Sequence, residues 1–171
     1  HPVLAPGKNG DVPSLLPGFS ENSRVTCTSC HGNDDPSGAT GPHGSVFKHL
    51  LKNRYNTNDY TTETPYEYDL CYQCHNRSSL LSNESGFIHR QHLDQQAPCS
   101  ICHDPHGISA TQGNSINNSH LINFDISIVQ DNTQGLRFFE DQGRFKGQCF
   151  LRCHNKNHNG SGYNESSHWE N

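Results

Sequence analysis

The sequence predicts a mostly irregular fold with a few short α-helices and minimal β-structure, whose core depends on more than its own side chains. Leu, Ile, Val and Phe together make up only 32 of the 171 residues, close to the limit below which chains stay disordered. The mean hydropathy is −0.87, and Asn, Gly, Ser and Pro are abundant. Eight Cys and thirteen His supply groups that bind metals or cofactors.

Composition also excludes several classes of function. No stretch approaches the roughly 18 consecutive apolar residues of a membrane-spanning helix. Twelve Lys and Arg against seventeen Asp and Glu give a formal net charge of −5, so we expect no membrane span and no nucleic-acid partner. The chain lacks Met and starts His1-Pro2-Val3, which we interpret as a processed N-terminus. We therefore expect an exported protein, either extracellular or periplasmic.

The Cys residues fall into four close pairs, and a His follows the second Cys of every pair. Three pairs read C-x-x-C-H and the fourth has one extra spacer residue. This motif attaches a c-type haem: the two thiols bond to the porphyrin vinyl groups, and the adjacent His binds the iron. The sequence therefore predicts four covalent haems per chain, bound through Cys27/Cys30, Cys71/Cys74, Cys99/Cys102 and Cys149/Cys153, with His31, His75, His103 and His154 as the proximal iron ligands.

Two other uses of paired cysteines remain open. Two C-x-x-C units can share one Zn²⁺, and an exported chain can join its cysteines as disulfides. Neither use explains why a His follows each of the four pairs. Four haems, by contrast, supply large apolar plates that can form the core for which the chain has few aliphatic side chains.

Each iron needs a second axial ligand, and we expect His at every haem because the chain has no Met. Bis-His iron lacks the Met ligand that raises the reduction potential, and it leaves no open position for a substrate. We expect the distal ligands among His1, His43, His89, His92 and His106, with His158 and His168 as weaker candidates and with His49 and His120 as neighbours of the haems.

An internal repeat divides the single domain, residues 1–171, into halves of about 1–80 and 81–171. Each half contains an upstream His, a C-x-x-C-H motif, a Pro-His-Gly element and a second haem motif. His43 and His106 occupy the two Pro-His-Gly elements, where Pro fixes the backbone and Gly permits close approach to a flat ring.

The upstream His of the two halves also correspond. His1 matches the pair His89 and His92, which share one face if their segment is helical and can then serve two stacked haems. We further expect short helices around Val46–Arg54, around Phe87–Asp94 and at the haem motifs, and a short strand over Phe124–Val129.

The chain resembles multihaem c-type cytochromes with doubled C-x-x-C-H motifs over nearly its whole length, and four haems in a chain of about this length are similar to the OmcE-like extracellular filament cytochromes. The resemblance extends to His1-Pro2-Val3, to His103-Asp104-Pro105-His106-Gly107 and to Leu121-Ile122-Asn123-Phe124-Asp125. It implies stacked haems in a continuous chain and one axial His donated across the subunit contact. For that role we expect His1, because the Pro-rich stretch after it can act as an extended arm.

The expected function is electron transfer without catalysis. Our first interpretation is the repeating subunit of a conductive extracellular filament, or nanowire, in which identical subunits join head to tail. Its other partners would be redox proteins or extracellular electron acceptors. The alternative is a soluble periplasmic tetrahaem carrier. A multihaem reductase would need an iron with an open position, which the surplus of His disfavours.

Overall fold

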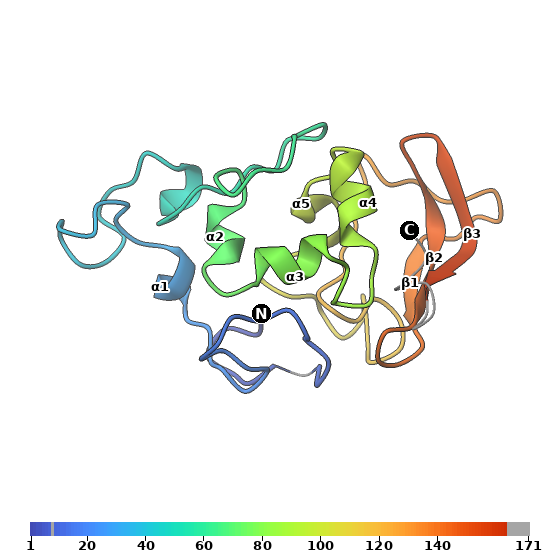
Figure 1. Cartoon of the computed structure of the whole chain (residues 1–171), viewed down its shortest axis with the longest axis horizontal. Helices are drawn as coiled ribbons and strands as arrows, with labels where there is room; N and C mark the ends of the chain where they lie inside the picture. The colour runs from blue at the N-terminus through green and yellow to red at the C-terminus, as the bar shows by residue number, and fades with distance from the viewer. Residues whose placement is uncertain (8, 164–171) are drawn as a thin grey trace.

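The computed structural model describes residues 1–7 and 9–163, so the candidate His168 lies outside the described residues. Short helices and one small sheet are joined by long irregular segments, which confirms the predicted fold class (Figure 1). No helix in the described part of the chain is long and apolar enough to cross a membrane. The helices are α1 (Cys27–Cys30), α2 (Asp69–Tyr72), α3 (Arg77–Leu81), α4 (His89–Asp94) and α5 (Cys99–Cys102), with a 3₁₀ turn η1 (Lys48–Leu50).

Three of the helices are formed by the haem motifs themselves. α1 and α5 begin at the first Cys of their motif and end at the second. The backbone N–H of the His that follows donates back to the carbonyl of the first Cys, at 2.8 Å for His31, 2.9 Å for His103 and 3.0 Å for His75 beyond α2. Since residues three apart share a helix face, α1 and α5 each present their two thiols on the same side, whereas α2 ends before Cys74, the second Cys of its motif.

The fourth motif lies on a strand instead. An antiparallel sheet is formed by β1 (Phe138–Asp141), β2 (Gly147–Cys153) and β3 (Lys156–Tyr163), in the order β1-β2-β3. Cys149 and Cys153 are both on β2, four residues apart, and residues an even number apart face the same side of a strand. The extra spacer residue therefore brings the two thiols to one face of the sheet, where both pack against Leu151.

Two predicted elements take another form. Phe124–Val129 is a turn and not a strand, because the carboxylate of Asp125 accepts a hydrogen bond from the N–H of Ser127 at 2.9 Å and bends the backbone. The helix expected around Val46–Arg54 is reduced to η1, where His49 has a left-handed φ of 62°. The helix expected near Phe87–Asp94 is confirmed as α4.

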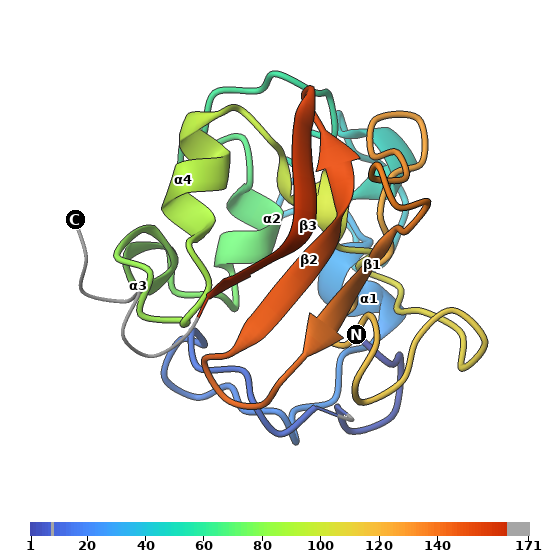
Figure 2. The ribbon, with the colours of Figure 1, turned by 90° about the vertical axis from the view of Figure 1, so that its right-hand side faces the viewer.

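The side-chain core is small and lies against the sheet. Ile101 and Val129 are each 1% exposed and pack with Leu151 of β2. Figure 2 shows the sheet closing one end of the molecule, with α2 and α4 behind it. Cysteines of the third and fourth motifs pack directly against this cluster, so whatever binds to them extends the core.

We expect the Ile101→Ala variant to lose about 2–5 kcal/mol of unfolding free energy in the haem-loaded protein, because it opens a cavity in the small cluster. Ile116→Ala is the matched control, since Ile116 is 56% exposed, and should change stability by less than about 0.5 kcal/mol. Chemical denaturation followed by absorbance measures both. Equal effects of the two substitutions would show that this cluster is not a core.

Candidate haem sites

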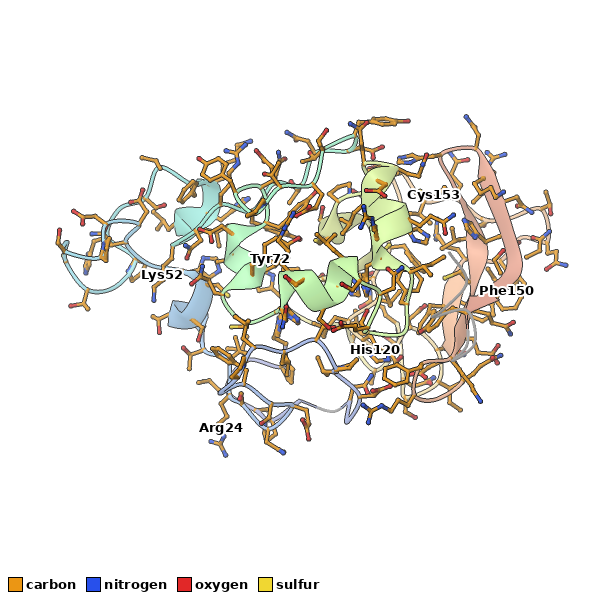
Figure 3. The ribbon with its side chains drawn as sticks, viewed as in Figure 1. Arg24, Lys52, Tyr72, His120, Phe150 and Cys153 are labelled. Atoms are coloured by element: carbon orange, nitrogen blue, oxygen red, sulfur yellow. The ribbon has the colours of Figure 1, made fainter. Side chains whose placement is uncertain are left out.

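The four motifs are called here sites 1 to 4 in chain order. Their elements α1, α2, α5 and β2 follow one another along the long axis of the molecule (Figure 1). Lys52, whose Nζ donates to the carbonyl of Thr28 in site 1, and Cys153 of site 4 lie far apart in Figure 3. The sites therefore form a row from one end of the molecule to the other.

Thiols of consecutive sites are neighbours. Burial, followed by the charge of Cys71 in site 2, raises the pKa of Cys30 in site 1. A side-chain hydrogen bond to Cys99 in site 3 raises the pKa of Cys71 well above its usual value. Burial and then the nearby Cys149 and Cys153 of site 4 raise the pKa of Cys102 to about 12. These influences run from each site to the next in the order 1, 2, 3, 4, which agrees with the order of the sites along the molecule.

Three proximal His rings each face another His ring of the same chain. A metal–imidazole nitrogen bond is about 2.0 Å long, so two imidazoles on opposite sides of one iron have centroids about 6 Å apart. The residues present therefore fit a bis-His haem at sites 1, 2 and 3. The observed centroid distances are 6.1 Å for His31 and His106, 5.9 Å for His75 and His1, and 6.4 Å for His103 and His89.

Hydrogen bonds orient these rings as metal ligands. A ligating His binds the metal through one nitrogen and donates the N–H of the other to an acceptor, which fixes the tautomer. Nδ1 of His31 lies 2.7 Å from the carbonyl oxygen of His49. Nδ1 of His103 lies 2.9 Å from the carbonyl oxygen of His120. In both rings Nε2 is left for the iron.

The upstream His are anchored in the same manner. Their Nε2 atoms are likewise left free, which suits a distal ligand. In His1, Nδ1 lies 3.1 Å from the carbonyl oxygen of Pro105. In His89, Nδ1 lies 2.9 Å from the hydroxyl oxygen of Ser85. In His92, Nδ1 lies 3.0 Å from the carbonyl oxygen of Ile88.

Burial keeps two of the paired rings neutral. Burial, with a smaller contribution from His103, lowers the pKa of His75 to about 4 and that of His89 to about 3. Only neutral imidazole binds a metal. These two ligands are therefore ready to coordinate iron at neutral pH without first releasing a proton.

A cavity of about 550 Å³ lies at site 3 and is lined by His103 together with Tyr55 and Phe124. This volume is within the range of cofactor pockets. A smaller cavity of about 220 Å³ lies at site 4, beside His154 and Tyr60. In the described part of the chain, no group of three or more His, Cys, Asp or Glu side chains is arranged to hold a metal ion by itself, and all eight Cys are free.

Site 4 differs from the other three. Nε2 of His154 lies 2.9 Å from a carboxylate oxygen of Asp59, and the Tyr60 ring stacks on His154 with a centroid distance of 4.8 Å. Among the described residues, no His ring faces His154. Two predicted distal candidates remain outside the three pairs: His43 is exposed, and His92 is half-buried and stacks on Phe87 at 4.8 Å. The weaker candidate His158 lies on β3 opposite Leu151.

His1 lies elsewhere than we expected. Its ring faces His75 of the same chain. The first residues fold back on the segment before α1, since the N–H of Leu4 donates to the carbonyl of Val25 and the N–H of Gly7 to that of Glu21, both at 2.8 Å. The stretch that we expected to be an extended arm is therefore held against its own chain.

Sequence reasoning missed two groups of functional contacts. The backbone carbonyls of His49 and His120 accept hydrogen bonds from the proximal candidates His31 and His103. The matching positions of His49 and His120 in the internal repeat could have indicated these contacts. Asp59 and Tyr60 both contact His154, and the bond to Asp59 joins residues that are 95 positions apart in the sequence. No local sequence pattern indicates such a contact.

Comparison with known proteins agrees with this geometry. Residues 19–79, which contain sites 1 and 2, match the family described as the doubled CXXCH motif. The match supports a multihaem c-type cytochrome that binds covalent haem and transfers electrons. No curated protein and no solved structure matches the chain.

We predict that the denatured protein exceeds its polypeptide mass of 19.1 kDa by four haem masses, because each motif holds two free thiols beside a His. The double variant Cys149→Ala/Cys153→Ala should lose one haem mass, and Cys27→Ala/Cys30→Ala should lose one as its matched counterpart. Mass spectrometry measures each. Three haems in the unaltered protein and in the first variant would mean that the motif with the extra residue is not used.

Proposed function

We propose that the chain conducts electrons through four bis-His c-type haems, and that it does so as the repeating subunit of an extracellular head-to-tail filament. The observation that carries the proposal is the row of sites along the long axis (Figure 1). The thiols of each site influence those of the next, and sites 1 and 4 lie toward opposite ends of the row. A conduit of this form accepts an electron at one end and releases it at the other.

Bound haem supplies a one-electron iron couple, and the protein supplies position and surroundings. The paired thiols would attach each porphyrin, and the facing imidazoles would bind its iron. Buried side chains such as Ile101, which is 1% exposed, keep water from the inner sites. With both axial positions filled, the iron offers no place for a substrate, so the chain carries electrons without catalysing a reaction.

The filament part of the proposal rests on the two Pro-His-Gly elements. His106 follows the motif of site 3 in sequence, yet its ring faces His31 of site 1. A Pro-His-Gly element thus serves a site other than the one it follows. His43 is the repeat counterpart of His106, follows site 1 and is exposed. By the same relationship, His43 serves a site beyond its own chain, and site 4 of a neighbouring copy is the one whose proximal ring faces no other His.

The ends of the molecule suit this contact. The segment of residues 33–50 forms the end beside α1, and β2 and β3 form the other (Figure 1). Asp35 in this segment and Arg152 and Lys156 near site 4 are exposed, so opposite charges would meet. Val46, two residues beyond the Pro-His-Gly element, is 85% exposed and offers apolar surface. Such a heterologous contact does not close on itself and extends into a polymer.

A discrete exported carrier is the second candidate, and one observation favours it. His92 lies three residues after His89 on α4, so the two rings share a helix face. Nδ1 of His92 bonds to the carbonyl of Ile88, which leaves Nε2 free. If His92 completes site 4, all four haems are bis-His within one chain and no second copy is needed.

The His43→Ala variant should abolish filaments seen by electron microscopy and leave one haem per chain open to carbon monoxide, because site 4 loses its distal ligand. His49→Asn is the matched control, since His49 is exposed in the same segment and Asn accepts its left-handed backbone. It should polymerise normally. Intact filaments in His43→Ala, together with one open haem in His92→Ala, would contradict the filament proposal and support the carrier.

We predict that the native protein has only low-spin iron and binds carbon monoxide slowly in its reduced form, because every axial position is occupied. Electron paramagnetic resonance of the oxidised protein measures the spin state. A high-spin haem in the assembled native protein would indicate an open iron and favour a reductase.

A further inference from the structure

Two short segments outside the haem motifs approach the proximal ligands in the same way. They are His49–Leu50 beside site 1 and His120–Leu121 beside site 3, and are called here latch 1 and latch 2. They lie 18 and 17 positions after the proximal His that they contact. Each stands at the same place in its half of the internal repeat.

Each latch makes two bonds to the region of its motif through its own carbonyls, and the residue two positions after the latch adds a third through its backbone N–H. At latch 1, the carbonyl of His49 contacts Nδ1 of His31 at 2.7 Å. The carbonyl of Leu50 accepts the N–H of Gly32 at 2.8 Å, and the N–H of Lys52 donates to the carbonyl of Cys30 at 2.9 Å.

Latch 2 repeats the pattern. The carbonyl of His120 contacts Nδ1 of His103 at 2.9 Å. The carbonyl of Leu121 accepts the N–H of Asp104, and the N–H of Asn123 donates to the carbonyl of Cys102, both at 2.9 Å. The two halves of the repeat therefore make the same set of contacts around their first motif.

Both latches hold an unfavourable backbone. The φ angles are 62° and 53° at His49 and Leu50, and 55° and 62° at His120 and Leu121. Left-handed conformations are rare for residues other than Gly, and two in a row are rarer still. Consecutive residues of helical conformation have nearly parallel carbonyls, so the first carbonyl reaches the imidazole while the second reaches the neighbouring backbone. Leu50 is 42% exposed, so burial of its side chain does not account for the strain.

The other two proximal ligands lack this support. In the described part of the chain, Nδ1 of His75 and Nδ1 of His154 have no hydrogen-bond acceptor from the protein. His154 is bonded only through Nε2, to Asp59. Sites 1 and 3, the first motif of each half, are thus distinguished from sites 2 and 4.

We propose that the two left-handed latches are positioning elements that make His31 and His103 more basic iron ligands and thereby lower the reduction potentials of the haems at sites 1 and 3. The inference rests on the proposed function, because it requires haem at these sites. A carbonyl that accepts the Nδ1–H fixes the tautomer and increases the electron density that Nε2 donates. The ferric state gains more from this donation than the ferrous state, and hydrogen bonding of this kind is a known determinant of haem potential.

Substitutions at Leu50 separate the latch from side-chain packing. Leu50→Ile keeps the size and hydrophobicity but is β-branched, which opposes a left-handed backbone. Leu50→Gly removes the side chain but favours that backbone. We expect an upward shift in the potential of the site 1 haem in Leu50→Ile and none in Leu50→Gly, with the other three haems unchanged. Redox titration followed by nuclear magnetic resonance of the haem methyl groups measures each haem separately.

The reverse order, in which Gly shifts the potential and Ile does not, would overturn the inference and assign Leu50 a packing role. If Leu50→Ile fails to fold, Leu121→Ile and Leu121→Gly repeat the comparison at site 3. In the unaltered reduced protein, the Nδ1–H protons of His31 and His103 should exchange with D₂O more slowly than that of His154, which is also partly exposed but has no Nδ1 acceptor among the described residues. Equal exchange rates would contradict the latch inference, but four covalently bound haems would still support the proposed function. Absence of covalent haem would contradict the proposed function itself.

Discussion

Imidazole rings that face each other across about 6 Å, the distance that two iron–nitrogen bonds require, are the contacts on which the rest of the structure depends. The pair of His31 and His106 joins the two halves of the chain. The pair of His75 and His1 holds the first residues against site 2. Apart from these pairs, the buried cluster around Ile101 is small. In the proposed haem-loaded protein, iron coordination would take over much of the role that aliphatic packing has in ordinary domains, and this would explain how so polar a chain holds a defined shape.

The internal repeat organises both the ligands and their supports. Each half places a strained latch beside its first motif and a Pro-His-Gly element close behind it in sequence. The ring of His106 reaches across to His31 in the other half, so in the proposed haem-loaded protein the halves would exchange a ligand and would not form separate units. His43 stands at the equivalent place with no partner ring among the described residues. A unit that exchanges ligands internally in this way can extend the exchange to a further copy, which links the repeat to the proposed polymer.

The local parts of the site could be predicted from the sequence, and the long-range parts could not. The Cys pairs and proximal His are adjacent in the chain, so their spacing alone indicates haem attachment. The partner of each proximal ring depends on tertiary structure: His106 and His43 occupy identical motifs and both are exposed, yet only the ring of His106 faces another His among the described residues. The latches act through carbonyl oxygens, which side-chain patterns do not reveal.

The fold shows the same division. Short helices at C-x-x-C-H follow from one turn of backbone and were predictable. The sheet around the fourth motif was not, because β3 is almost entirely polar and rich in Asn and Gly. The most direct test of the whole account is a cryo-electron microscopy map of the native, haem-loaded protein. The account predicts one iron midway between the rings of each facing pair, with the irons in the order of sites 1 to 4. An iron at site 1, 2 or 3 bound by any other His would contradict it.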